Sequence, residues 1–149
     1  MTKNNNKYAI ITGAAGLLGQ EHAKALLEAG FNIILTDINF NLLKKQKKNL
    51  EKNYKNKILI KKMDVSKETS VKSIYNYIKK NKLFLEVLVN NAAIDAKVQG
   101  KNNSRLNNLE NLDFKNFIKE FNVGLLGAII ATKYFGKIIS KNRKGGSII

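Results

Sequence analysis

The chain contains no cysteine and no proline, and His22 is its single histidine. Without cysteine it can form neither a disulfide framework nor a thiolate metal site, and one histidine cannot form a histidine cluster. We therefore predict no bound metal. No uninterrupted apolar run reaches the roughly 18–20 residues of a membrane span, and the N-terminus lacks the apolar segment of a secretory signal. These features predict a cytoplasmic protein with no membrane partner.

Acidic residues are scarce, since 27 Lys and Arg outnumber 11 Asp and Glu and give a net charge of +16. Such an excess can indicate a nucleic acid or another polyanion as partner. However, 25 of the 27 basic residues are Lys, spread over every segment with a helical pattern, and Asn is abundant with 21 copies. This distribution is typical of a solvated surface and of an AT-rich coding sequence. We therefore predict no nucleic-acid partner and keep polyanion binding as an alternative.

The length of 149 residues and the hydrophobic content of 44% suit one domain, residues 1–149, with a sizeable core. One polar, Asn-rich stretch runs from Gln99 to Asp113. We interpret it as a loop or short helix over one edge of the fold rather than as a linker between domains.

Short apolar runs alternate with helical patterns along the chain. The expected strands are Tyr8–Thr12, Asn32–Thr36, Ile58–Met63, Leu85–Val89 and the start of a fifth at Ser147–Ile149. The expected helices are Leu17–Ala29, Asn39–Tyr54, Lys67–Asn81 and Asp113–Ser140, with Gly30 ending the first helix and Ser66 capping the third. This order predicts an α/β fold with a doubly wound parallel sheet between two layers of helices and the strand order 3-2-1-4, the fifth strand being barely begun.

Three glycines, Gly13, Gly16 and Gly19, lie between the first strand and the first helix. In a Rossmann-type fold the first glycine permits the tight turn, the second lets the backbone approach a pyrophosphate, and the third allows close packing of helix on strand. The positive end of the helix then faces the phosphates. The glycine spacing alone is weakly specific, but its place between strand and helix predicts dinucleotide binding. The alternative is a packing turn.

Asp37 ends the second strand, 24 residues after Gly13. An acid at this place accepts hydrogen bonds from the adenosine ribose hydroxyls and repels a 2′-phosphate. No Arg in the loop or just after Asp37 offsets that repulsion. We therefore predict NAD as the cofactor rather than NADP. The alternative is that Asp37 caps the next helix.

Four short motifs resemble the short-chain dehydrogenase/reductase family. Thr12–Gly19, "TGAAGLLG", is similar to its cofactor loop, in the spacing of the family's extended branch. Asp64–Val65 resembles the adenine clamp, in which the acid and the following N–H meet the adenine edge. Asn90–Ala93, "NNAA", resembles a motif that supports the sheet and the cofactor ribose. Phe121–Gly127 resembles the helix segment whose Asn distorts the helix and holds a water in the proton relay.

The resemblance implies an NAD(P)-dependent oxidoreductase that passes hydride between the nicotinamide and a hydroxyl or carbonyl carbon of a small-molecule substrate. It implies Asn122 as a catalytic residue. The implied cofactor-binding residues are Thr12, Gly13, Ala15, Gly16, Leu17, Leu18, Gly19, Asp37, Ile38, Asp64, Val65, Asn91, Ala92 and Ala93. The residues of the loop and of "NNAAID" also resemble those of bacterial family members that act in flagellin modification and nonulosonic-acid biosynthesis. This resemblance implies a sugar or sugar-nucleotide substrate.

The family's chemistry further needs a Ser and a Tyr-x-x-x-Lys pair after the fifth strand, and this chain ends as that strand begins. Tyr134 is followed four residues later by Ile138, and Tyr75 with Lys79 lies on the helix between strands three and four. We therefore expect only the N-terminal part of the family's domain, truncated after the start of the fifth strand and inactive alone. The alternative is a non-catalytic dinucleotide-binding module.

A truncated chain would leave apolar side chains of the long helix without their neighbours. We expect Leu125, Ile129 and Ile130 to be exposed, a large apolar patch for a monomer. In the family this helix forms part of a dimer interface, so the resemblance implies a homo-oligomeric full-length parent.

Overall fold

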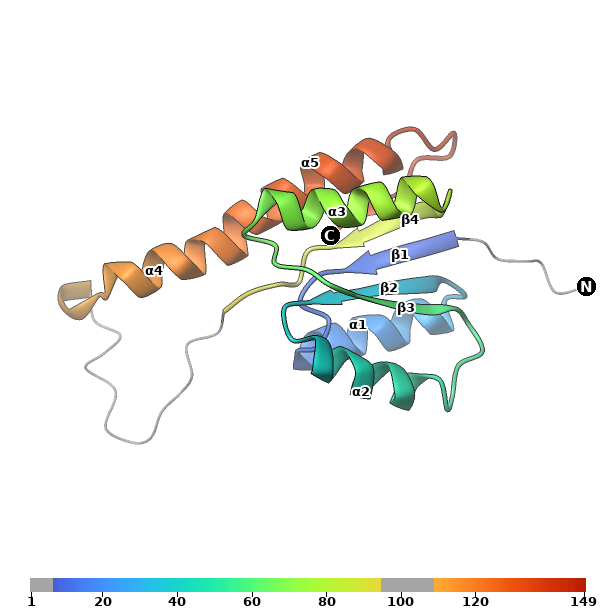
Figure 1. Ribbon diagram of the computed structural model, residues 1–149, viewed down its shortest axis with the longest axis horizontal. Helices are drawn as coiled ribbons and strands as arrows, with labels where there is room; N and C mark the ends of the chain where they lie inside the picture. Colours follow the sequence, from blue (N-terminus) through green and yellow to red (C-terminus); the bar gives the residue numbers. More distant parts are fainter. Residues whose placement is uncertain (1–6, 95–108) are drawn as a thin grey trace, which may run out of the picture.

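The computed structural model describes residues 7–94 and 109–149. Within these ranges five parallel strands form one sheet in the order β3-β2-β1-β4-β5 (Figure 1). The strands are β1 (Lys7–Ile11), β2 (Asn32–Asp37), β3 (Ile58–Lys62), β4 (Phe84–Val89) and β5 (Ser147–Ile148). The predicted α/β fold, its strand order and its short fifth strand are confirmed.

Helices cover both faces of this sheet. On one face α1 (Leu17–Glu28) and α2 (Phe40–Leu50) pack against β1, β2 and β3 through a cluster that includes Ala23, Leu27 and Leu43. On the other face α3 (Glu68–Lys80) and α5 (Gly127–Ile139) enclose a second cluster that includes Val71 and Phe135. The strands are apolar on both sides because both sides are buried, and the three layers are those of a Rossmann-type fold.

Parallel pairing aligns the carboxyl ends of the strands at one edge. β1 lies at the centre of the sheet, with Ile11 opposite Leu35 of β2 and Val89 of β4. The segments that follow β1, β2, β3 and β4 therefore emerge side by side. Ligands of open α/β sheets bind at such an edge.

Two local predictions about helix ends had different outcomes. Gly30 follows the end of α1 with φ of 84°, and Phe31 N–H donates to Leu26 O, so Gly30 ends the helix as predicted. The predicted capping by Ser66 is wrong, because Lys67 is the N-cap residue of α3 and no side chain caps it. α3 begins at Glu68, one residue later than predicted, so Ser66 lies before the N-cap position, and its hydroxyl donates to Asp64 Oδ1 at 2.6 Å. α2 also ends at Leu50, earlier than predicted.

The predicted long helix Asp113–Ser140 consists of three parts. α4 (Phe114–Phe121) is followed by η2 (Asn122–Leu126), a π-helical turn closed by Gly127 N–H on Asn122 O, and then by α5. α4 and η2, here called the arm, continue the line of α5 beyond the end of the sheet (Figure 1). Neither α4 nor η2 contains a buried residue.

The exposure predicted for the long helix is partly correct. Leu125 and Ile129 are 50% and 55% exposed, as expected, whereas Ile130 is partly buried against the core cluster of α3 and α5. By length and average composition the run Phe114–Ile139 could cross a membrane. In the fold 22% of its most apolar window is buried. Phe135 and Ile139 of this run are core residues, and a helix that covers a sheet can have the same length and apolar composition.

The polar stretch Gln99–Asp113 lies mostly outside the described residues. Its end contains a short 3-10 helix, η1 (Leu109–Asn111), just before the arm begins. The prediction of a loop or short helix is thus tested only for this end.

Candidate functional site

The glycine loop after β1 contains two positions at which only glycine fits. Gly13 has φ of 61°, and a Cβ there would lie 2.7 Å from Ala92 Cα. A Cβ on Gly19 would lie 2.7 Å from Ala14 Cα, so this glycine allows α1 to pack closely on the loop. Gly16 has room for a Cβ, with Gly13 O as nearest atom at 3.4 Å. The first and third predicted glycine roles therefore have a steric basis in the chain itself.

Thr12 and Asn91 hold this loop against the end of β4. The Thr12 hydroxyl accepts from the N–H groups of Asn91 and Ala92, both at 3.0 Å. The Asn91 amide donates in turn to Thr12 O at 3.0 Å and Gly13 O at 2.9 Å. Thr12 is buried, so its own side chain serves the loop rather than the cavity.

Asp37 joins the glycine loop to the turn after β2. Its Oδ2 accepts from Ala15 N–H at 3.0 Å, and its Oδ1 accepts from Asn39 N–H at 2.8 Å. The alternative that Asp37 caps α2 is wrong, because Asn39 is the N-cap residue and its side chain accepts from Leu42 N–H. Two N–H donors orient the carboxylate of Asp37 without using all four of its lone-pair sites.

Asp64 lies across the same edge, after β3. Its Oδ1 accepts from Ser66 N–H at 3.1 Å and from the Ser66 hydroxyl, and its Oδ2 lies 3.6 Å from Lys67 Nζ. The next residue, Val65, is buried against Gly127, where an added Cβ would lie 2.8 Å from Val65 Cγ2. Val65 is therefore the point at which the long helix meets the sheet edge.

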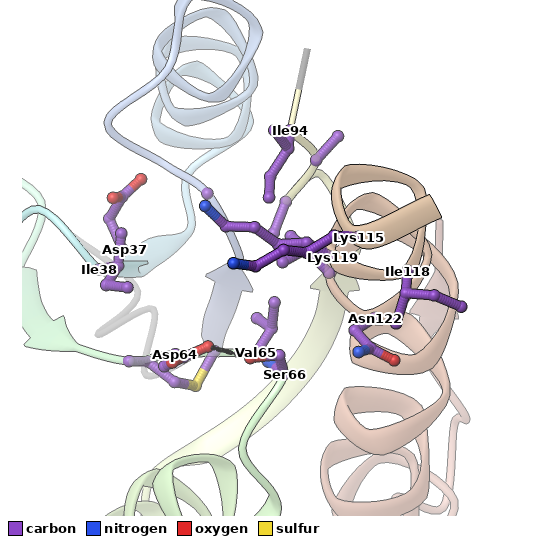
Figure 2. Close-up of a pocket in the computed structure, with 15 residues that line it drawn as sticks. Asp37, Ile38, Asp64, Val65, Ser66, Ile94, Lys115, Ile118, Lys119 and Asn122 are labelled. Carbon is purple, nitrogen blue, oxygen red and sulfur yellow. Dashed lines mark hydrogen bonds between the residues drawn. The ribbon is translucent and has the colours of Figure 1, made fainter. Parts of the chain in front are cut away.

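These segments surround a cavity of about 530 Å³ at the carboxyl end of the sheet (Figure 2). The predicted site residues that line it are Gly13, Asp37, Ile38, Asp64, Val65, Ala92, Ala93 and Asn122. Asn122 comes from the first turn of η2, so it is placed where the helix departs from α geometry, as the resemblance implied. The structure thus brings together residues from five separate segments of the sequence.

The other predicted residues lie beside the cavity rather than in its wall. Thr12, Ala15 and Asn91 support the loop through the hydrogen bonds given above. Gly16 is the N-cap of α1, and Leu17 and Leu18 follow it with exposed side chains. The first N–H groups of a helix have no partner within that helix. This loop and helix end can therefore receive an anion from the solvent side.

Sequence reasoning missed seven lining residues: Met63, Ser66, Ile94, Lys115, Ile118, Lys119 and Val123. Three of them, Lys115, Ile118 and Lys119, precede Asn122 at intervals of three and four residues, which places all four on one helix face. That spacing is a signal that the sequence carried. Among residues 7–94 and 109–149, no three His, Cys, Asp or Glu side chains gather as a metal site would require.

Proteins with similar sequences are oxidoreductases. A diacetyl reductase of Staphylococcus epidermidis that forms (S)-acetoin is 33% identical over 145 residues, which is 97% of this chain and 52% of the relative. An uncharacterized oxidoreductase of Bacillus subtilis is 32% identical over 100% of this chain and 50% of its own length. A mitochondrial borneol dehydrogenase of Lavandula x intermedia is 29% identical over 95% of this chain and 50% of its own. The chain spans about half the length of these relatives.

Solved structures with a similar fold include an oxidoreductase and an alcohol dehydrogenase. An oxidoreductase from Haemophilus influenza named for D-mannonate, with bound NAD, has a TM-score of 0.78 at 28% identity, covering 93% of this chain and 52% of its own. An alcohol dehydrogenase from the archaeon Thermococcus sibiricus, complexed with 5-hydroxy-NADP, has a TM-score of 0.80 at 27% identity, covering 95% and 56%. The family model described as short chain dehydrogenase matches residues 7–149. The chain therefore belongs to the short-chain dehydrogenase family.

Proposed function

We propose that the chain binds the adenosine half of a nicotinamide dinucleotide and forms the cofactor-binding part of a dehydrogenase or reductase. The observation that carries this proposal is the position of Asp37. Its carboxylate is fixed by Ala15 N–H of the glycine loop and lines the cavity of about 530 Å³ at the sheet edge. A fixed acid beside a glycine loop and an open helix N-terminus matches the donors and charges of a ribose joined to a pyrophosphate.

The residues present divide naturally among the parts of such a cofactor. The loop from Gly13 and the N-terminus of α1 would face the pyrophosphate, and Asp37 would accept from the ribose hydroxyls. Asp64 and Val65 would meet the adenine, since Asp64 Oδ2 has only the distant Lys67 as partner among the bonds described. The bound cofactor would supply hydride transfer, while Asn122 would help to position a proton carrier near the nicotinamide.

The whole protein's activity is a proposal of the same kind. We propose hydride transfer to or from a hydroxyl or carbonyl carbon, with NAD preferred because of Asp37, and a sugar or sugar nucleotide as substrate. Names of similar proteins span a diketone, a terpene alcohol and a sugar acid, all of which are alcohols or carbonyl compounds. The Ser and the Tyr-x-x-x-Lys pair that the family's chemistry needs would lie outside residues 1–149.

Calorimetric titration of the full chain with NAD and with ADP-ribose tests the binding proposal. We expect both ligands to bind. Asp37→Ala should lower the affinity for each by about tenfold or more, because charged hydrogen bonds to the ribose are lost. Glu21→Ala is the matched control, since Glu21 is an acid on the exposed side of α1. Absence of NAD binding to the intact, folded chain would refute the proposal. Steep salt dependence with no nucleotide preference would favour polyanion binding instead.

We also propose that the full protein is a homo-oligomer. The arm exposes Phe114, Ile118 and Leu125, among other apolar side chains, and an apolar patch of this kind is typical of an interface. Sedimentation velocity at several concentrations would test this. A strictly monomeric species at all concentrations would contradict it.

A further inference from the structure

Two lysines of the arm lie at the cavity although no predicted motif includes them. Lys115 and Lys119 are four residues apart on α4, and both line the cavity with Asp37 and Asp64. Figure 2 shows their side chains extending from α4 across the cavity, with the ammonium groups on the side of Asp37. The wall opposite the two acids is therefore cationic.

Neither ammonium group has an ion pair within the described part of the chain. The ion pairs there join Lys7 to Glu86, Lys24 to Glu21, Lys47 to Glu51, Lys67 to Asp64 and Lys133 to Glu68. Two acids lie close in sequence, Asp113 and Glu120. Asp113 accepts from the N–H groups of Lys115 and Asn116 and from the Asn116 amide, and none of the ion pairs above includes Glu120. Among residues 7–94 and 109–149, the two ammonium groups thus have no acidic partner where they face the cavity.

The two acids of the cavity, in contrast, already have donors. Asp37 accepts from two backbone N–H groups, and Asp64 accepts from Ser66 and lies near Lys67. Their negative charges are partly compensated by these contacts. The arm side of the cavity carries the two ammonium groups of Lys115 and Lys119, so this side suits an anionic group.

We propose that Lys115 and Lys119 bind a phosphate of the adenosine half of the cofactor. This inference rests on the proposed function, because it assumes that the cavity holds that half. Two phosphates have the required chemistry, namely the pyrophosphate on the 5′ carbon and the 2′-phosphate of NADP. In the second case the lysine pair would offset the repulsion by Asp37 and weaken the proposed preference for NAD, although no Arg lies directly after Asp37.

The test is a chemical-shift titration of the full chain with adenosine, 5′-ADP and 2′-AMP. These probes share the base and ribose and differ in the presence and place of phosphate. The variant K115Q/K119Q removes both charges, K115R/K119R keeps them, and K44Q/K48Q is the control. Lys44 and Lys48 are exposed, have the same spacing on α2, and are not among the lining residues.

We expect K115Q/K119Q to lower the affinity for a phosphorylated probe by roughly tenfold and to leave the affinity for adenosine unchanged. K115R/K119R should bind the phosphorylated probe as the original chain does. A loss confined to 2′-AMP assigns the pair to the 2′-phosphate, and a loss confined to 5′-ADP assigns it to the pyrophosphate. If all three probes bind the K115Q/K119Q variant as they bind the original chain, the lysine inference is wrong and the proposed function stands. If the original chain binds no probe at all, the proposed function fails, and the inference fails with it.

Discussion

Helices α3 and α4 both carry apolar residues at helical spacing, yet only α3 buries them. α3 buries Val71, Ile74 and Ile78 against the sheet, whereas α4 contains no buried residue. The same contrast exists along the long helix, where Phe135 is 0% and Phe114 is 73% exposed. Apolar spacing therefore predicts which side of a helix needs cover, but not whether the fold provides it.

Truncating one phenylalanine in each region is the strongest test of this contrast. Phe135→Ala should lower the free energy of unfolding by about 3–5 kcal/mol, because it leaves a cavity between α5 and the sheet. Phe114→Ala should change it by less than about 0.5 kcal/mol. Urea unfolding followed by circular dichroism measures both. Similar losses for the two variants would show that the arm is covered in solution.

Two glycines three residues apart sharpen the boundary between the regions. A Cβ on Gly127 would lie 2.8 Å from Val65 Cγ2, whereas a Cβ on Gly124 would meet nothing within 4 Å. Gly127→Ala should therefore destabilise the fold by about 1–2 kcal/mol, net of the gain in helix propensity. Gly124→Ala should stabilise the helix by up to about 1 kcal/mol. Urea unfolding gives the sign of each change in the free energy of unfolding. Equal signs would contradict a boundary between packed and exposed helix that lies between Gly124 and Gly127.

Helix caps offer a third, smaller comparison. Asn39 caps α2 and Asp113 caps α4, each through a side-chain oxygen that accepts from backbone N–H groups. Asn39→Ala should lower global stability by about 1 kcal/mol, because α2 packs on the sheet. Asp113→Ala should mainly fray α4, so that amide exchange speeds up at Lys115 and Asn116 while the unfolding midpoint hardly moves. A large midpoint shift for Asp113→Ala would mean that the arm unfolds together with the core.

The smallest expected effect concerns an exposed contact between α3 and α5. Hydrogen bonds from Lys133 at 2.7 Å and from Tyr134 at 2.8 Å lower the pKa of Glu68 below its ordinary 4.5. A lowered folded-state pKa means that this contact stabilises the fold fully above the ordinary pKa and less as the pH falls through the lowered value. Thermal unfolding between about pH 3 and pH 6 should therefore depend less on pH in Glu68→Gln. An unchanged pH dependence would show that other carboxylates dominate.

The sequence was sufficient for the parts of the fold that depend on local periodicity and on turn chemistry. Apolar runs identified the strands of a sheet buried on both faces, and Gly13 and Gly19 occupy positions where a side chain would collide with backbone. The capping role of Ser66 was wrongly predicted because α3 begins one residue later than expected, and sequence patterns locate a helix end only to within one or two residues. Ile130 was misread because it borders the packed face of α5.

The lysine side of the cavity could not be placed from the sequence alone. Lys115 and Lys119 lie about 80 residues beyond Asp37. They line the same cavity as Asp37 because α5 packs on the sheet and Gly127 lets the helix approach Val65. Helical spacing from Asn122 could have grouped them with that residue. It could not have shown that their face turns toward the cavity rather than toward solvent.

The π-helical turn at Asn122–Leu126 sets how α4, the helix directly before it, is rotated about its own axis. An i→i+5 turn holds about one residue more than an α turn, and each residue of an α-helix advances by about 100° around the axis. α4 is therefore rotated by roughly that angle from the phase that an uninterrupted helix would give it. Deleting one residue within the turn would restore that phase and swing the lysine tips away from Asp37, although no residue of α4 itself had changed.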